Sequence, residues 1–213
     1  MNDRTKKLTT IAMLCAMAYV VMVVIRIPVV LFLKYEAKDV IIAIGGFLFG
    51  PLASVAVSVV TSLVEMVTVS DTGLYGLIMN IISSLSFAAV AALIYQRKRS
   101  VGGAVLGLIA AIVVQVSVML LWNYIITPVY MGQPRDAVAK MLVPVFLPFN
   151  LLKSSLNATI TMLLYKPVVT ALRKAGLVPD SQSKGGINIG AFVVSAIALV
   201  GLILWMLIWK GII

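Results

Sequence analysis

The chain has 213 residues, of which 62% are hydrophobic and 11% are charged, and its formal net charge is +10. A soluble domain is about half apolar and about a quarter charged, so the composition excludes that class and predicts a polytopic membrane protein. With no His and the single Cys15, the sequence also excludes imidazole metal sites, Ser-His and Cys-His nucleophile pairs and a disulfide framework, and we expect no metal site.

The first apolar segment, residues 8–33, follows basic residues within 4–7. Lys and Arg accumulate in cytoplasmic flanks, so we expect the N-terminus to be cytoplasmic. No small-residue cleavage pattern follows, so we interpret this segment as a retained helix rather than a signal peptide. Ala12 and Ala16 form a small-xxx-small step, which permits close approach of another helix but also occurs in ordinary packing.

A charged connection, KYEAK at residues 34–38, precedes a short apolar segment at 39–49. As a helix this segment would be about 16 Å long, which is too short to cross a bilayer core of about 30 Å. The sequence therefore predicts that a connection dips toward it, buried in protein or lining a cavity. Asp39 is open to two interpretations, an N-cap of the short helix or part of a wall over that cavity.

Gly50-Pro51 is a turn signal, and it separates the short segment from the next one, residues 51–70. With this division, four crossings separate the basic N-terminus from Arg97–Arg99, and an even number leaves both on the cytoplasmic face. Without it the number would be three. Glu65, near the outer end of its segment, is expected either to pair with a lysine or to reach the interface.

Three further apolar segments are each long enough to cross a membrane, and the last two are joined by an outer connection at residues 128–140. They lie at residues 74–95, 101–127 and 141–165. Residues 176–186 are polar and rich in Gly and Ser, which predicts a cytoplasmic linker. Residues 187–209 form a final apolar helix.

Polar side chains in these segments are expensive in lipid and usually face a bundle interior or a cavity. Asn150, Lys153 and Asn157 are spaced i, i+3 and i+7, so they share one helix face. Lys153 is either a donor to a ligand or a lysine that reaches the interface or pairs with a carboxylate. Asn80 and Asn123 are equally compatible with hydrogen bonds between helices.

Several stretches together resemble a known family. They are TKKLTTIAMLCAMAYV, FLKYEAKDVIIAIGGFLFGP, GLIMNIISSLSF with IYQRKR, WNYIITPVY and PFNLLKSSLN, within about residues 5–170. In this order and spacing they resemble the substrate-binding S-component of an energy-coupling-factor (ECF) vitamin transporter, most closely the riboflavin-specific type. No single stretch is decisive, and the order of the stretches carries the resemblance.

The resemblance implies an all-α transmembrane bundle with a six-helix core and an outward-facing vitamin pocket in the plasma membrane. Such proteins bind the vitamin without energy and then work with a membrane coupling subunit and two ATPase subunits. The chain itself is therefore not expected to be an enzyme. The ligand is expected to be riboflavin or flavin mononucleotide, and no cofactor is expected.

The resemblance also assigns roles to residues of this chain. Ala12 and Ala16 would meet the coupling subunit. The substrate-binding residues would be Leu33, Tyr35, Ala37, Asn123, Asn150 and Lys153, with Asn80 as a further candidate.

The predicted organisation is a vitamin-binding membrane domain at 1–175, a linker at 176–186 and an extra transmembrane helix within 187–213, which departs from the family's six helices. Three alternatives remain open. The chain could take another vitamin, although a cationic thiamine would be repelled by Lys153. It could be a membrane enzyme that uses Asp39, Glu65 or Lys153, although no nucleophile-base arrangement is present. It could also be an assembly protein whose polar residues only join helices.

Overall fold

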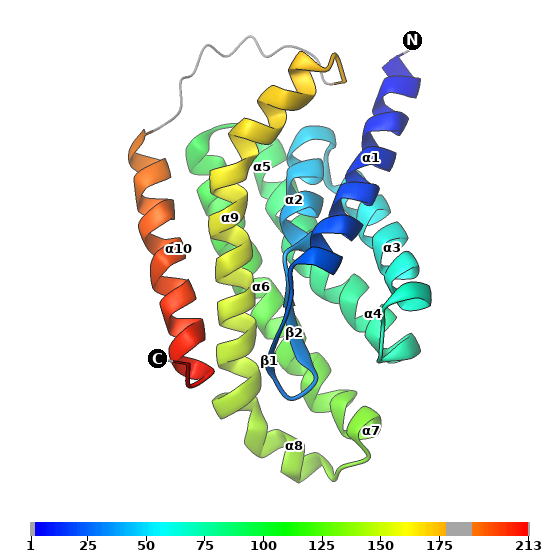
Figure 1. The fold of residues 1–213 in the computed structure, drawn as a ribbon, viewed down its shortest axis with the longest axis vertical. Coiled ribbons are helices and arrows are strands. Elements are labelled where there is room, and N and C mark those ends of the chain that lie inside the picture. The colour runs from blue at the N-terminus through cyan, green and yellow to red at the C-terminus, as the bar shows by residue number, and fades with distance from the viewer. Residues whose placement is uncertain (1–2, 178–188, 213) are drawn as a thin grey trace.

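The computed structural model describes residues 3–177 and 189–212, which form a helical bundle with one β-hairpin beside its helices (Figure 1). The main helices are α1 (Asp3–Val24), α2 (Lys38–Phe49), α3 (Pro51–Thr68), α4 (Gly73–Ser84), α5 (Val90–Arg97), α6 (Val101–Ile125), α7 (Thr127–Met131), α8 (Arg135–Met141), α9 (Leu147–Lys174) and α10 (Ile189–Trp209). The π-helical segments η1 (Leu85–Ala89) and η2 (Leu142–Phe146) join α4 to α5 and α8 to α9. The hairpin strands are β1 (Arg26–Val30) and β2 (Leu33–Glu36).

Six helical stretches of the described residues are long and apolar enough to cross a membrane. They are residues 4–24, 51–68, 73–97, 101–125, 135–174 and 189–209. The prediction of an all-α transmembrane bundle is therefore confirmed, and the helix predicted at 187–209 is present as α10. Residues 178–186 of the predicted linker lie outside the described residues.

The division at Gly50-Pro51 is confirmed, because α2 ends at Phe49 and α3 begins at Pro51. Pro51 occupies the first turn of α3, where its missing N–H is not needed. Gly50 has φ +92°, a backbone conformation that side chains disfavour. The reversal places the α5–α6 turn, which contains Arg97–Arg99, at the same end of the bundle as the N-terminus (Figure 1).

The predicted first helix, residues 8–33, is wrong beyond Val24, because residues 26–36 form the hairpin. Pro28 cannot continue a helix, and the β-branched residues around it favour extended backbone. The strands pair antiparallel, with Arg26 opposite Glu36 and Ile27 opposite Tyr35. The KYEAK segment is thus mostly a strand rather than a solvated connection. It supplies the dipping connection that the short helix was expected to need.

Helix α2 is enclosed by the bundle, with every residue from Lys38 to Phe47 buried. Gly46 permits this packing, since a Cβ there would lie 2.1 Å from Ser54 Oγ and 2.8 Å from the Cβ of Ala92. The N-cap position of α2 is Ala37, so the prediction of Asp39 as N-cap is wrong. Asp39 lies instead in the first turn of α2, buried inside the bundle.

The predicted segment 141–165 corresponds to a longer helix, since α9 runs from Leu147 to Lys174. It starts after η2 because Pro144 and Pro148 disturb the regular hydrogen-bond ladder. Helix α10 packs along α9 (Figure 1) and exposes most of its other side chains. Its residue Met206 is buried in an apolar cluster with Leu152 and Leu156 of α9.

Candidate substrate-binding site

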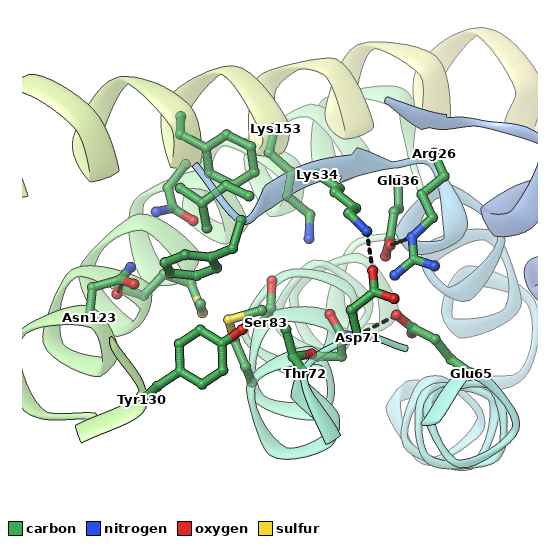
Figure 2. Close-up of a pocket in the computed structure, with 17 residues that line it drawn as sticks. Arg26, Lys34, Glu36, Glu65, Asp71, Thr72, Ser83, Asn123, Tyr130 and Lys153 are labelled. Atoms are coloured by element: carbon green, nitrogen blue, oxygen red, sulfur yellow. Dashed lines mark hydrogen bonds and ion pairs between the residues drawn. The ribbon is translucent and has the colours of Figure 1, made fainter. Parts of the chain in front are cut away.

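A cavity of about 170 Å³ lies between the hairpin and helices α3, α4, α6 and α9 (Figure 2). The lining residues come from elements far apart in the sequence, so the cavity exists only in the folded bundle. Ligand pockets usually enclose about 300–1,000 Å³. A vitamin-sized ligand would therefore enter only if the lining side chains moved apart to enlarge the cavity.

Amide side chains form one end of the cavity. Asn123 and Asn150 are 1% and 2% exposed and line it from α6 and α9. Their Nδ2 groups donate to backbone carbonyls one turn earlier in the same helix, at 2.7 and 2.8 Å. Thr127 donates to Asn123 Oδ1 at 2.9 Å. No described residue donates to Asn150 Oδ1, so this oxygen is available as an acceptor for a ligand.

Lys153 lines the cavity next to the amide end, and its Nζ lies 3.8 Å from Asp39 Oδ2. Asp39 is fully buried and accepts hydrogen bonds from Ser84 Oγ at 2.5 Å and from Asn157 Nδ2 at 3.2 Å. An unpaired lysine at this depth would be costly in a membrane. The carboxylate balances that charge while the ammonium still faces the cavity. Lys153 therefore pairs with a carboxylate, as one of its interpretations predicted, and its role as a donor to a ligand stays a prediction.

Charged side chains form the opposite end of the cavity (Figure 2). Arg26 Nε lies 3.1 Å from Glu36 Oε1, and Lys38 Nζ lies 3.3 Å from Glu36 Oε2. Lys38 also pairs with Glu65, whose Oε1 accepts a hydrogen bond from Asn80 Nδ2 at 2.8 Å. Glu65 therefore pairs with a lysine, as one of its two interpretations predicted.

Two contacts join the hairpin to the connection between α3 and α4. Lys34 Nζ lies 2.5 Å from Asp71 Oδ2, and Arg26 donates to the carbonyl of Val69 at 2.5 Å. The Asp71 side chain is 72% exposed, so this pair lies at the solvent edge of the cavity. The hydrogen bond and positive charge of Lys34 lower the pKa of Asp71 below its usual value.

Aromatic rings add an apolar surface to the cavity. Phe32 and Tyr130 both line it, and their ring centroids lie 5.2 Å apart in an edge-to-face arrangement. Phe149 lines it from α9. A flat, apolar ring system would fit beside such side chains, with its polar edges directed to the amides.

The predicted substrate-binding residues divide into two groups. Leu33, Asn80, Asn123, Asn150 and Lys153 line the cavity together. Tyr35 and Ala37 are buried but are absent from the lining, and the Tyr35 hydroxyl donates to Asn157 Oδ1 at 3.1 Å.

The prediction missed the charged end, which includes Arg26, Lys34, Glu36 and Asp71. The strand LKYE alternates apolar and charged side chains with a period of two, a signal that could have located part of it.

Ala12 and Ala16 lie on the outer surface of α1, whereas Leu14 and Ala18 between and beyond them face the core. The small-residue step is thus accessible from outside the bundle. Among the described residues, no group of three His, Cys, Asp or Glu side chains is arranged to hold a metal ion.

A family model described as "ECF transporter, substrate-specific component" matches residues 6–165. A riboflavin transporter named RibU from Staphylococcus aureus is 29% identical over 81% of this chain and 95% of its own length. A riboflavin transporter named FmnP from Bacillus subtilis is 26% identical over 81% of this chain and 98% of its own length. A solved S component of a bacterial ECF transporter has a TM-score of 0.70, at 29% identity, over 80% of this chain and 99% of its own.

Proposed function

This chain belongs to the family of substrate-specific components of ECF transporters, and from that premise we propose that it binds riboflavin and delivers it across the membrane. Two similar proteins carry the name riboflavin transporter, and they match this chain over nearly their whole lengths. The chain acts as a substrate-binding component rather than as an enzyme. Hydrolysis of ATP then takes place in partner subunits.

The observation that carries the choice of ligand is the amide end of the cavity beside aromatic rings. A flavin has a large flat ring with an imide edge, in which one N–H lies between two carbonyls. Asn150 Oδ1 can accept from that N–H, and Lys153 can donate to a neighbouring carbonyl. Phe32, Tyr130 and Phe149 would contact the ring itself.

Charge balance supports an uncharged vitamin over a cationic one. Lys153 would repel a thiamine-like cation, although Asp39 offsets part of its charge. The enzyme alternative is not favoured by the geometry, because Glu65 is held by Lys38 and Asn80, and Asp39 is held by Ser84 and Asn157. Neither carboxylate is free to act as a base.

The outer face of α1 is proposed to contact a membrane coupling subunit that works with two ATPase subunits. Ala12 and Ala16 allow close helix approach there, and both are exposed. The chain is placed in the plasma membrane with its N-terminus and Arg97–Arg99 on the cytoplasmic side, because basic residues accumulate on that side. The end of the bundle that carries α7 and α8, opposite the N-terminus in Figure 1, then faces outward.

Ligand binding by the purified chain tests the proposal directly. Trp122 neighbours Asn123 in α6, so riboflavin is expected to quench intrinsic fluorescence, with a signal diluted by Trp205 and Trp209. Mass spectrometry of small molecules that copurify with the protein provides an independent measurement. A chain that neither retains nor binds any flavin, while another vitamin saturates it, would contradict the proposal.

A further inference from the structure

The two ends of the cavity differ in chemistry, and only the amide end is used by the imide edge of a flavin. In Figure 2, Asn123 lies on one side, Lys153 lies between, and the charged residues lie on the other side. An elongated ligand with its ring edge at the amides would extend its tail toward the charged end. The residues there determine which tails are accepted.

Each cation of the lining already has a carboxylate partner. Arg26 pairs with Glu36, Lys34 pairs with Asp71, and Lys153 pairs with Asp39. A bound anion would therefore have to break an ion pair, and it would also meet Glu36, Glu65 and Asp71 in the lining. Hydroxyl groups face no such conflict, because each can donate to a carboxylate and accept from an ammonium or guanidinium.

We propose, on the basis of the riboflavin-binding function above, that Asp71 determines specificity by holding Lys34 and repelling phosphate, so that the site selects an uncharged hydroxylated tail over a phosphorylated one. A phosphate monoester carries a charge of about −1.5 to −2 at neutral pH. With Asp71 neutralised, Lys34 becomes available to that phosphate, and Arg26 lies on the same strand pair.

Asp71 is the residue of the charged end that can be changed with least effect on folding. Its side chain is 72% exposed on the short connection between α3 and α4, whereas Glu36 and Glu65 are buried in the ion-pair network. Lys34 lowers the pKa of Asp71, so its carboxylate is ionised near neutral pH, where the second phosphate proton is also mostly lost.

The experiment measures Kd for riboflavin and for flavin mononucleotide in the full-length chain and in Asp71→Asn. We expect the ratio of the mononucleotide Kd to the riboflavin Kd to fall about 1.5- to fivefold in Asp71→Asn. Asp136→Asn is the matched control. It removes an exposed carboxylate in α8 that is outside the cavity lining, and it should leave the ratio unchanged.

Two further measurements separate charge from shape. Adding Lys34→Gln to Asp71→Asn should return the ratio toward its wild-type value, because the freed ammonium is gone. Raising the ionic strength should also make the fall in this ratio smaller, since the attraction between the exposed Lys34 and the phosphate is screened by salt. An unchanged ratio in Asp71→Asn, in a wild-type background that binds riboflavin, overturns this inference alone. A wild-type chain that binds neither flavin overturns the proposed function, and the inference with it.

Discussion

At the scale of single residues, Lys153 combines two properties that are usually separate. It is 7% exposed, lines the cavity and still lies near a carboxylate, Asp39. The charge of Lys153 is therefore already balanced before a ligand arrives, because the ion pair forms during folding and not during ligand binding. Asn150, one helical turn earlier on the same face, contributes an acceptor oxygen to the same wall.

Replacing Lys153 by Ala should weaken riboflavin binding about 10- to 150-fold, since a hydrogen bond to a charged group is worth about 1.5–3 kcal/mol. Asn150→Ala should weaken riboflavin binding by a somewhat smaller factor than Lys153→Ala. Fluorescence titration of the purified variants measures both effects. Lys140→Ala, which changes an exposed lysine of α8 outside the lining, is the control and should bind like wild type. Wild-type riboflavin affinity in both cavity variants would show that the ligand does not contact Lys153 and Asn150.

Asn150 and Lys153 could be predicted to share a face because both lie on one regular helix, where a spacing of three places side chains together. That Asn123 of α6 would lie with them was implied only by the family resemblance. The charged end was not predicted, because it depends on tertiary pairing. Lys34 and Asp71 are brought together by the hairpin and by the α3–α4 connection. Neither residue has a local pattern that identifies the other as its partner.

At the scale of elements, the hairpin is a wall of the cavity whose position is set by contacts from other parts of the chain. It is attached by Lys34–Asp71 and by Arg26 to Val69. Residues of α10 also share apolar clusters with residues of the hairpin, and α10 is beyond the part of the chain that the family model matches. Trp209 packs against the apolar cluster that contains Leu33, Val138, Phe146 and Phe149.

Trp209→Ala should therefore speed riboflavin release, because Leu33 and Phe149 belong both to that cluster and to the cavity lining. An increase of about tenfold in the dissociation rate corresponds to roughly 1.4 kcal/mol. Stopped-flow fluorescence with excess competing ligand measures the rate. Trp205→Ala is the matched control, since Trp205 is 37% exposed on the same helix. Equal release rates in the two variants would show that α10 does not support the cavity wall.

The exposed small residues of α1 lead to a prediction that separates transport from binding. Ala12→Trp or Ala16→Trp adds bulk on the outer surface of α1, away from the cavity, and should obstruct the coupling subunit. Uptake by cells that express the complete transporter should fall, whereas riboflavin affinity of the isolated chain should persist. Leu106→Trp, at an exposed position of α6, should leave uptake intact. Normal uptake in both α1 variants would exclude this docking surface.

At the scale of the whole molecule, the reversal between α2 and α3 was predictable because the charge distribution and one Gly-Pro pair both point to it. The boundary after α1 was missed because hydropathy alone does not reveal where a helix changes to a strand. Pro28 and the β-branched residues around it were the local signal for that change. Hydropathy identifies a segment that avoids water. It does not distinguish a lipid-facing helix from a hairpin that is buried by its own protein.

Single-cysteine labelling tests the membrane orientation in a Cys15→Ser background. A cysteine at Ser100, between α5 and α6, should react only with reagents that reach the cytoplasm. A cysteine at Gln133, between α7 and α8, should react with impermeant reagents added outside. Labelling of Ser100→Cys from outside would reverse the proposed orientation.

The buried ion pairs also have an electrical consequence. Among the described residues, the charged groups of the bundle interior and inner hairpin are Arg26, Lys38, Lys153, Glu36, Asp39 and Glu65. Their formal charges cancel. A membrane voltage acts on net charge, with about 2.3 kcal/mol per elementary charge per 100 mV. A neutral vitamin adds no net charge to this interior when it binds, so uptake should be insensitive to depolarisation, whereas a phosphorylated cargo would make it voltage-dependent.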